Sequence, residues 1–591
     1  MILMSMNVAK GLAMNAQPTL DSLFRKPGLP SGNLKRKLEI PDAERAYKAT
    51  KLSTETTVED VAGEEDDDFE AGPALPPDDE EAEDGDRFFG GGVTKSSAAA
   101  LDYLDQQQQD GEDEADYGAE KIDSSWLRRL TTTFEKKVTK NAEQRARYES
   151  QPQKFMASEA DLDAEIKTWS LLASHPELYP EFAGSESVGL LVGLVGHENT
   201  DIAIAALEIL AELLDEDVDA EAEQWEVLVG ALLEADLLDL LLSNLARLDE
   251  TLESDRSGVY HSLSILESLG GQRTVAERIG TEKVLTWLCR RLEKPEKTTT
   301  QNKQYAAEVL QVLLQSSPLL RKRLALDIDG IDLLCQLLAT YRKRDPKKDS
   351  TEEEFAENVF DALTCTVDEA VGKAKFVEAE GVELALLMLK EGGFSKPRAL
   401  RLLDHACGGP GAGVCEKLVE AAGLKTVFGL FGKKVDGTTT EHLLGIFASL
   451  LRLLPGESGA RIRTLAKFTG KGNEKVSKLL TLREDYARRV GAIDSDIYSE
   501  REVLSGEEVE EKADEYLSRR LDAGLYVLQT VDVILAWLVA EDSGVRELVS
   551  GGGMLEAVRE SLQEQLDGLD GEVDGEGEVK DMLGTLLEVL G

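Results

Sequence analysis

An eight-residue apolar pattern recurs along the middle of this 591-residue chain, between Ser187 and Phe431. Each copy has apolar residues at positions i, i+3, i+4 and i+7 or i+8, which places them on one face of a helix. The six copies begin 49, 47, 47, 51 and 42 positions apart, at Val188, Leu237, Val284, Ile331, Val382 and Leu424. A helical pattern that returns at such intervals predicts one repeated unit rather than several unrelated domains.

The interval indicates the kind of repeat. A period of roughly 40–47 residues is typical of armadillo or HEAT repeats. Each copy is followed by a second helical segment, such as IAALEILAEL, HSLSILESL, YAAEVLQVLL, NVFDALTCTV or RALRLLDHA. We therefore expect an all-α fold, a right-handed armadillo/HEAT-type α-solenoid with a disordered acidic N-terminal tail. A solenoid of this kind has a long concave surface that binds other chains.

Charge and cysteine content limit the function classes. With 66 basic and 114 acidic residues the formal net charge is −48, which argues against direct nucleic-acid binding because that affinity comes from Lys and Arg. The acidity suits basic partners, although solubility alone explains part of it. No stretch approaches the ~18 apolar residues of a membrane helix, and the first residues do not resemble a secretory signal. Five cysteines without a Cys-x-x-Cys motif indicate a reducing cytosol or nucleus rather than a disulfide framework.

Composition and periodicity divide the chain into five segments. Acidic, Gly and Gln runs near the amino end contain too little apolar surface to order the chain, and solenoids need atypical units at their ends. The predicted segments are a disordered tail (1–120), capping helices (121–183), armadillo-like repeats (184–455), a helical C-terminal cap or further repeats (456–545) and an acidic Gly-rich segment with short helices (546–591). Within the fourth segment, long helices are expected over Lys471–Val490 and Glu507–Val539.

The tail holds one basic island, residues 33–52, with the sequence NLKRKLEIPDAERAYKATKL. A basic cluster within an acidic tail predicts a nuclear-localisation signal, and a charged linker is the alternative explanation. The signal residues are Lys35, Arg36, Lys37, Lys48 and Lys51. We therefore expect a nuclear protein. The preceding QPTLDSLF stretch has the character of a short docking motif.

The sequence contains no convincing catalytic, cofactor or metal site. The stretch Gly90–Ser96 resembles a phosphate-binding loop, but Thr94 stands where that motif requires Gly before the Lys. His405, Cys407 and Cys415 lie close together in the sequence, yet free cysteines mainly behave as small buried apolar residues. We expect a protein that is not an enzyme.

The second helix of each repeat is expected to line the concave groove. Residues at i and i+4 lie on one face of a helix, and aligning these helices selects Glu208, Glu212, Ser264, Ser268, Glu308, Asp361, Arg401 and His405. The four carboxylates predict attraction to Lys- and Arg-rich segments, although each exposed pair contributes only ~0–1 kcal/mol. No Trp is followed by Asn four residues later, so the groove lacks the ladder of the importin-α family.

Several separate motifs resemble those of the beta-catenin-like protein 1 family, over roughly residues 130–539. The matching segments are Thr133–Lys137, Lys154–Glu159 with Asp161–Asp163, Pro176–Tyr179, Gly193–Asp201, Ala399–Ala406 and Arg519–Gln529. The resemblance implies an armadillo-repeat nuclear protein without catalytic activity, associated with the spliceosome through the NineTeen complex. It also implies partners with basic segments, namely splicing factors that include the Myb-like subunit of that complex.

The resemblance leaves rival functions open. A nuclear-transport adaptor for basic cargo and a catenin-like cytoplasmic scaffold fit the same repeats. Self-association, the binding register and the role of the segment after Val539, which matches weakly, also stay open. No cofactor, metal or membrane partner is expected.

Overall fold

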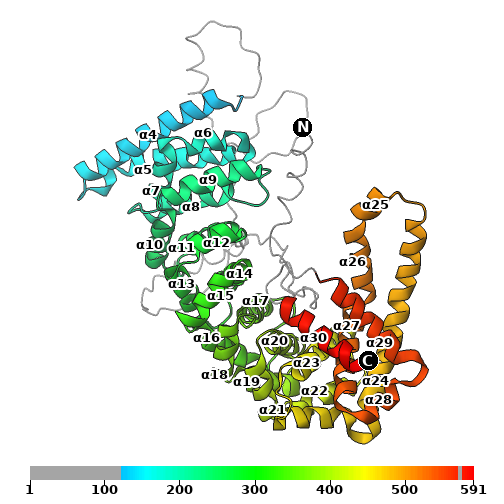
Figure 1. The fold of residues 1–591 in the computed structure, drawn as a ribbon. Helices are drawn as coiled ribbons and strands as arrows, with labels where there is room; N and C mark the ends of the chain where they lie inside the picture. The colour runs from blue at the N-terminus through cyan, green and yellow to red at the C-terminus, as the bar shows by residue number, and fades with distance from the viewer. Residues whose placement is uncertain (1–120, 570–575) are drawn as a thin grey trace, which may run out of the picture. The chain divides into compact units, whose positions relative to one another are not determined.

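The computed structural model describes residues 121–569 and 576–591. Within these ranges the chain forms 27 α-helices, α4 to α30, with a few short 3-10 turns and no β-strand. The helices follow one another in a stack (Figure 1). The prediction of an all-α solenoid is confirmed. The predicted disordered tail, its basic island and the QPTLDSLF stretch lie outside the described residues.

The described part begins with three helices, α4 (Ser124–Arg147), α5 (Met156–Thr168) and α6 (Tyr179–Ala183). Their aromatic residues form one cluster in which the Trp169 ring lies 5.4 Å from that of Phe134 and 4.7 Å from that of Phe182, between ring centroids. All three rings are fully buried. This cluster joins the first helices, which the sequence assigned to a cap, into one apolar core.

The central region repeats a unit of three helices. The first helices of the units are α9 (Ala222–Glu234), α12 (Arg273–Ile279), α15 (Pro318–Leu326), α18 (Ala370–Glu378) and α21 (Ala412–Glu420). The second helices are α7 (Glu186–Leu194), α10 (Leu237–Arg247), α13 (Glu282–Glu293), α16 (Gly330–Ala339), α19 (Gly381–Glu391) and α22 (Leu424–Phe431). The third helices are α8 (Thr200–Leu213), α11 (Glu253–Gly270), α14 (Gln301–Ser316), α17 (Thr351–Thr366), α20 (Ser395–Cys407) and α23 (Gly437–Leu453).

The sequence identified two helices of each unit, and these are the second and third helices of the structure. It did not identify the short first helix. A sharp turn separates this helix from the second one. The residue at the turn has a positive φ in four units, at Asp236, Asp329, Glu380 and Ala422. A three-helix unit is the armadillo type of repeat rather than the two-helix HEAT type.

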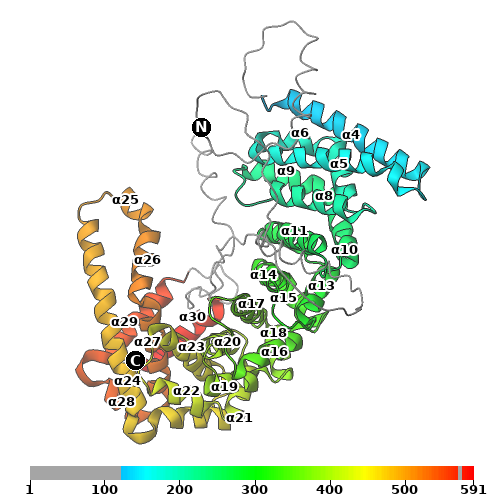
Figure 2. The ribbon, with the colours of Figure 1, turned by 180° about the vertical axis from the view of Figure 1, so that it is seen from behind.

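The third helices pack against one another in chain order, α8 on α11, α11 on α14 and so on to α23 (Figure 2). The series is continued by α27 (Leu525–Glu541), which packs against α23. We call these seven helices the third-helix layer. Apolar residues cover most of their circumference, so each helix is buried between its two neighbours. Only a narrow stripe of each helix remains for partners.

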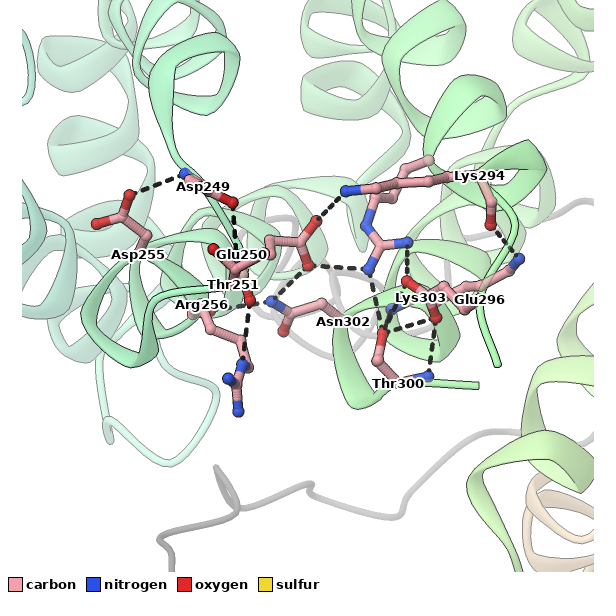
Figure 3. Close-up of polar contacts among 11 residues, drawn as sticks. Asp249, Glu250, Thr251, Asp255, Arg256, Lys294, Glu296, Thr300, Asn302 and Lys303 are labelled. Carbon is pink, nitrogen blue, oxygen red and sulfur yellow. Dashed lines mark hydrogen bonds and ion pairs between the residues drawn. The ribbon is translucent and has the colours of Figure 1, made fainter. Parts of the chain in front are cut away.

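The loops between second and third helices are joined by ion pairs. Arg291, at the end of α13, is 6% exposed and contacts Glu250 of the preceding α10–α11 loop at 2.8 Å and Glu296 of its own loop at 2.9 Å (Figure 3). Asn302 Nδ2 donates to the same Glu250 at 3.2 Å. Because Glu250 receives both donors, it holds the loops of two consecutive units together.

The C-terminal part contains the remaining helices, α24 (Gly459–Arg501), α25 (Gly506–Glu511), α26 (Ala513–Ala523), α28 (Ser543–Val549), α29 (Met554–Asp567) and α30 (Glu576–Leu590). The helix predicted over Lys471–Val490 is the middle of the 43-residue α24. The range Glu507–Val539, also predicted to be helical, is not one continuous helix. It is divided into α25, α26 and α27, and Gly524 at φ +100° makes the break between the last two.

Candidate protein-binding surface

The structure places the eight residues selected from the sequence on five consecutive members of the third-helix layer. Glu208 and Glu212 lie on α8, Ser264 and Ser268 on α11, Glu308 on α14, Asp361 on α17, and Arg401 and His405 on α20. Six of them are half-buried, whereas Glu308 and Asp361 are buried. The helical i, i+4 rule therefore found one layer of the fold, but the residues differ in what they contact.

At the amino end of the layer the carboxylates have no cation of their own. Glu208 and Glu212 form no ion pair within 4.0 Å with any described residue. One carboxylate oxygen of Glu212 is buried and accepts no hydrogen bond there. Burial lowers the pKa of the nearby His261, and the charge of Glu212 opposes this shift. A buried carboxylate oxygen without a donor is costly, so this position favours an added cation or donor.

A hollow adjoins Glu208 between α5 and α8. It has a volume of about 410 Å³, and its lining includes Glu159, Asp163, Asp201 and Glu208. Lys167 also lines the hollow and donates to Asp163 Oδ2 at 2.7 Å. This hydrogen bond raises the pKa of Lys167, and the charge of Glu208 adds to the effect. The hollow thus already holds one ammonium group of the chain among its carboxylates.

In the middle of the layer the polar groups bind one another. Tyr305 donates to Glu267 Oε2 at 2.5 Å, which ties α14 to α11. Gln304 donates to Glu308 Oε2 at 3.2 Å within α14. From the sequence, Glu308 was expected to be an exposed carboxylate of the groove. The structure buries it, because α14 packs against α11 on one side and α17 on the other.

Further along the layer the acidic groups are neutralised by cations from the next helix. Asp361 on α17 forms an ion pair with Arg401 on α20. Burial raises the pKa of Asp361, and Arg401 opposes that shift. His405 Nδ1 lies 3.0 Å from Asp368. Asp361, 3% exposed, is therefore internal to the fold rather than presented to a partner.

The C-terminal helix covers the end of the layer. A small cavity of about 80 Å³ is lined by Asp404, Ser449 and Tyr526 from α20, α23 and α27. Val579 and Met582 of α30 line the same cavity. Because α30 packs against α27 and closes this cavity, it covers the carboxyl end of the layer and leaves the amino end at α8 and α11 uncovered by it.

The candidate chemical groups near Cys407 have structural roles. Cys407 and Cys415 are fully buried, and the Cys415 thiol donates to the Cys407 carbonyl oxygen at 3.6 Å. The hydrogen bond with Cys415 and burial both raise the pKa of Cys407, which keeps it protonated. Within the described residues no group of three or more His, Cys, Asp or Glu side chains is arranged to hold a metal ion. No single described helix is long and apolar enough to cross a membrane, although the bent pair α26 and α27 passes by length and composition.

Comparison with known proteins agrees with the three-helix repeats. Residues 98–566 match the model of the family described as catenin-beta-like, Arm-motif containing nuclear. The chain belongs to the catenin-beta-like family. This match spans the cap helices, all the repeats and most of α29, so it accounts for the stack as a whole.

Individual catenin-beta-like relatives come from distant organisms. The beta-catenin-like protein 1 homolog of Schizosaccharomyces pombe is 37% identical over 446 residues, which cover 75% of this chain and 77% of the relative. Human beta-catenin-like protein 1 is 39% identical over 430 residues, covering 70% and 76%. Among solved structures, an engineered protein aligns with 73% of this chain at 16% identity and a TM-score of 0.44.

Sequence reasoning missed the features that separate the two ends of this layer. The ion pair between Asp361 and Arg401 joins residues 40 positions apart, and the cover formed by α30 joins still more distant ones. The only sequence signal was the change from Glu at the α8 positions to Arg and His at the α20 positions. That change matches the difference in the structure between the unpaired carboxylates of α8 and the ion pair between α17 and α20.

Proposed function

We propose that this catenin-beta-like chain is a non-enzymatic nuclear scaffold that binds basic segments of pre-mRNA-splicing factors. The proposal rests on family membership and on one observation of the fold. The carboxylates Glu208 and Glu212 have no ion-pair partner among the described residues, whereas Asp361, further along the layer, is neutralised by Arg401. A basic segment supplies what the first pair lacks.

The binding region follows from the same contrast. The hollow beside Glu208 accepts a Lys or Arg side chain, and Lys167 already occupies part of it. The i and i+4 positions of α8 and α11 continue the surface through Glu212, Ser264 and Ser268. Serine hydroxyls supply neutral hydrogen-bonding groups next to the carboxylates. The expected ligand is therefore a short segment with two or more basic residues.

A peptide titration tests the binding region. We expect a Lys- and Arg-rich localisation-type peptide to bind the full chain with an affinity that falls as salt rises. Glu208→Lys with Glu212→Lys should weaken binding and reduce its salt dependence. Glu416→Lys with Glu420→Lys, on the first helix α21, is the matched control because it changes the net charge equally. Identical curves for the two double variants would remove α8 from the site.

Assignment of the protein to splicing depends on which partner proteins it binds. Affinity purification of the tagged chain from nuclear extract should recover NineTeen-complex subunits, including the Myb-like one. Recovery of only importin-β and nucleoporins would instead indicate a transport adaptor. Recovery of partners only from a cytoplasmic extract prepared in parallel would indicate a catenin-like scaffold.

Nuclear location has its own test. Replacing Lys35, Arg36 and Lys37 by Ala should move the protein to the cytoplasm, because these residues form the core of the basic island. Unchanged nuclear accumulation of this variant would refute the proposed signal without affecting the proposed groove.

A further inference from the structure

Lysines recur where second helices join third helices, in the connecting loops or in the adjoining helical turns, along one edge of the repeat stack. Four consecutive loops contribute. The residues are Lys297 before α14, Lys347 and Lys348 before α17, Lys390 and Lys396 around the α19–α20 loop, and Lys433 and Lys434 before α23. We call these seven residues the lysine edge. Lys396 is half-buried and the other six are exposed.

Contacts between neighbouring loops show that they share an edge. Asp345 Oδ1 of the α16–α17 loop accepts from the backbone N–H of Phe394 in the α19–α20 loop at 2.9 Å. Lys343 of the former loop also lies 3.6 Å from Glu391 at the end of α19. Second helices pack on second helices and third helices on third helices, from α13 to α23. Since packed helices lie about 8–10 Å apart, the loops recur at about that spacing.

Several acidic residues in and beside these loops are engaged in structural contacts. Glu296 pairs with Arg291 at 2.9 Å, and Glu391 pairs with Arg342 at 3.2 Å. Asp436 accepts from the backbone N–H of Thr439 at 2.8 Å and caps α23. None of the seven lysines, in contrast, forms an ion pair within 4.0 Å with a described residue. These three anions are used within the fold, whereas the seven lysines remain available.

The helix dipole accounts for only part of this row. A cation in the last turn of a helix is stabilised by the negative end of the dipole, and Lys390 lies in the last turn of α19. Lys433 and Lys434 directly follow α22, but Lys347 and Lys348 lie well beyond the end of α16, outside that short range. Their common placement needs another explanation.

We propose that the lysine edge binds the phosphate backbone of single-stranded nucleic acid without sequence preference. The sequence-independent part of nucleic-acid affinity comes from Lys and Arg side chains that neutralise phosphates along the strand. The four loops place such side chains in a line with a repeat of about 8–10 Å. A row of lysines would also attract an acidic protein segment. A second property of the edge has to distinguish a nucleic-acid ligand from an acidic protein.

That property is the lack of apolar anchors on the edge. Protein–protein interfaces are depleted in Lys and use aromatic residues, Met and Arg at their centres. No large apolar side chain is exposed in the four loops, all of which lie within the described residues. An edge with lysines and without anchors therefore favours a phosphate backbone. The formal net charge of −48 hides this arrangement because it averages over the whole chain.

Fluorescence anisotropy with a labelled 20-nucleotide oligouridylate tests the proposal on the full chain. We expect binding in the micromolar range at 50 mM salt that weakens steeply by 200 mM salt. Replacing Lys347, Lys348, Lys433 and Lys434 by Gln should weaken binding at least tenfold. The slope of log affinity against log salt should fall by up to about 3, since each single-strand phosphate contact contributes about 0.7.

The matched control replaces four exposed lysines away from the edge, Lys136, Lys283, Lys322 and Lys425, by Gln. It changes the net charge equally and should bind like the wild type. Both variants keep the basic island of residues 33–52, so only the edge distinguishes them. Equal weakening of the two variants, or no binding by the wild type at 50 mM salt, would overturn the proposal. Lysine-dependent binding of a polyglutamate peptide but not of the RNA would assign the edge to acidic proteins instead.

Discussion

Arg401 on α20 forms an ion pair with Asp361 on α17, and both side chains are largely withdrawn from solvent, at 12% and 4% exposed. The two residues occupy corresponding places on consecutive third helices. The corresponding position at the start of the layer, Glu208, has no ion-pair partner among the described residues, whereas the pair of Asp361 and Arg401 holds two helices of the layer together.

Replacing Arg401 by Met should leave Asp361 buried without its cation. We expect the free energy of unfolding to fall by about 3 kcal/mol, because removing one partner of a buried pair leaves an uncompensated charge. Urea unfolding monitored by circular dichroism measures this loss. The double variant Asp361→Leu with Arg401→Met removes both charges and should lose much less. Equal losses in the two variants would show that the cost comes from packing rather than charge.

Gly381 begins the second helix α19 directly after the turn at Glu380. A Cβ added to Gly381 would lie 2.2 Å from the ring of Phe376, which is fully buried. We expect Gly381→Ala to destabilise the protein by about 1–3 kcal/mol, since an overfilled core has to shift. Thermal unfolding measures the effect.

Gly429 is the control for this prediction because a Cβ there meets nothing within 4 Å. It lies inside α22, so Gly429→Ala should stabilise the protein by up to about 1 kcal/mol through helix propensity. A Gly381→Ala variant as stable as Gly429→Ala would contradict the tight contact between the first and second helices.

Asp532 on α27 gives the C-terminal core a pH dependence. Its carboxylate is fully buried and lies 2.6 Å from Arg483. Burial raises the pKa of Asp532 from 3.8 to about 6, with Arg483 opposing the shift. The folded protein then holds this proton more tightly than the unfolded chain does. The stabilisation is complete below about pH 4 and is lost as the pH rises through about 6.

We therefore expect the difference in unfolding free energy between the wild type and Asp532→Asn to change by about 1 kcal/mol between pH 5 and pH 7.5. The wild type should lose stability relative to the variant as the pH rises. Urea titrations at several pH values in this range measure the difference. A constant difference would mean that Asp532 stays ionised in the folded protein.

The cover formed by α30 depends on its apolar face. Leu583 is fully buried in this face, and Arg546 donates to the carbonyl oxygens of Val589 and Leu590 at the end of the helix, at 3.2 and 3.4 Å. We expect Leu583→Asp to release α30, because a carboxylate is costly in that position. Limited trypsin digestion should then cut rapidly after Lys580. The exposed Thr585→Asp is the control and should leave the cleavage rate unchanged.

The repeat architecture could be predicted from the sequence because the apolar residues of the second and third helices recur at helical spacing in every unit. The anchors Val188 to Leu424 all fall on second helices, and the eight groove candidates all fall on third helices. The apolar periodicity of the first helices is harder to detect in the sequence. The seven residues of α12, Arg273–Ile279, make less than two full turns, too few to display a period beside the turns that flank them.

Whether each carboxylate has a hydrogen-bond or ion-pair partner depends on residues far away in the chain. Glu212 and Asp361 follow the same helical pattern, yet one has a buried oxygen without a donor and the other contacts Arg401. A side chain some 40 residues distant decides between these outcomes, and only the packing of consecutive units brings it near. The cover that α30 forms over the layer likewise depends on tertiary packing, which brings residues far apart in the chain into contact.

The sequence by itself determined that this chain is a stack of amphipathic helices, because helical periodicity is a local property. Only the tertiary structure decided where its charges act. Stacking gathers lysines from Lys297 to Lys434 on one edge, although they are spread over more than a hundred positions of an acidic chain. Electrostatic attraction depends on distance in space, which a sum over the composition does not contain.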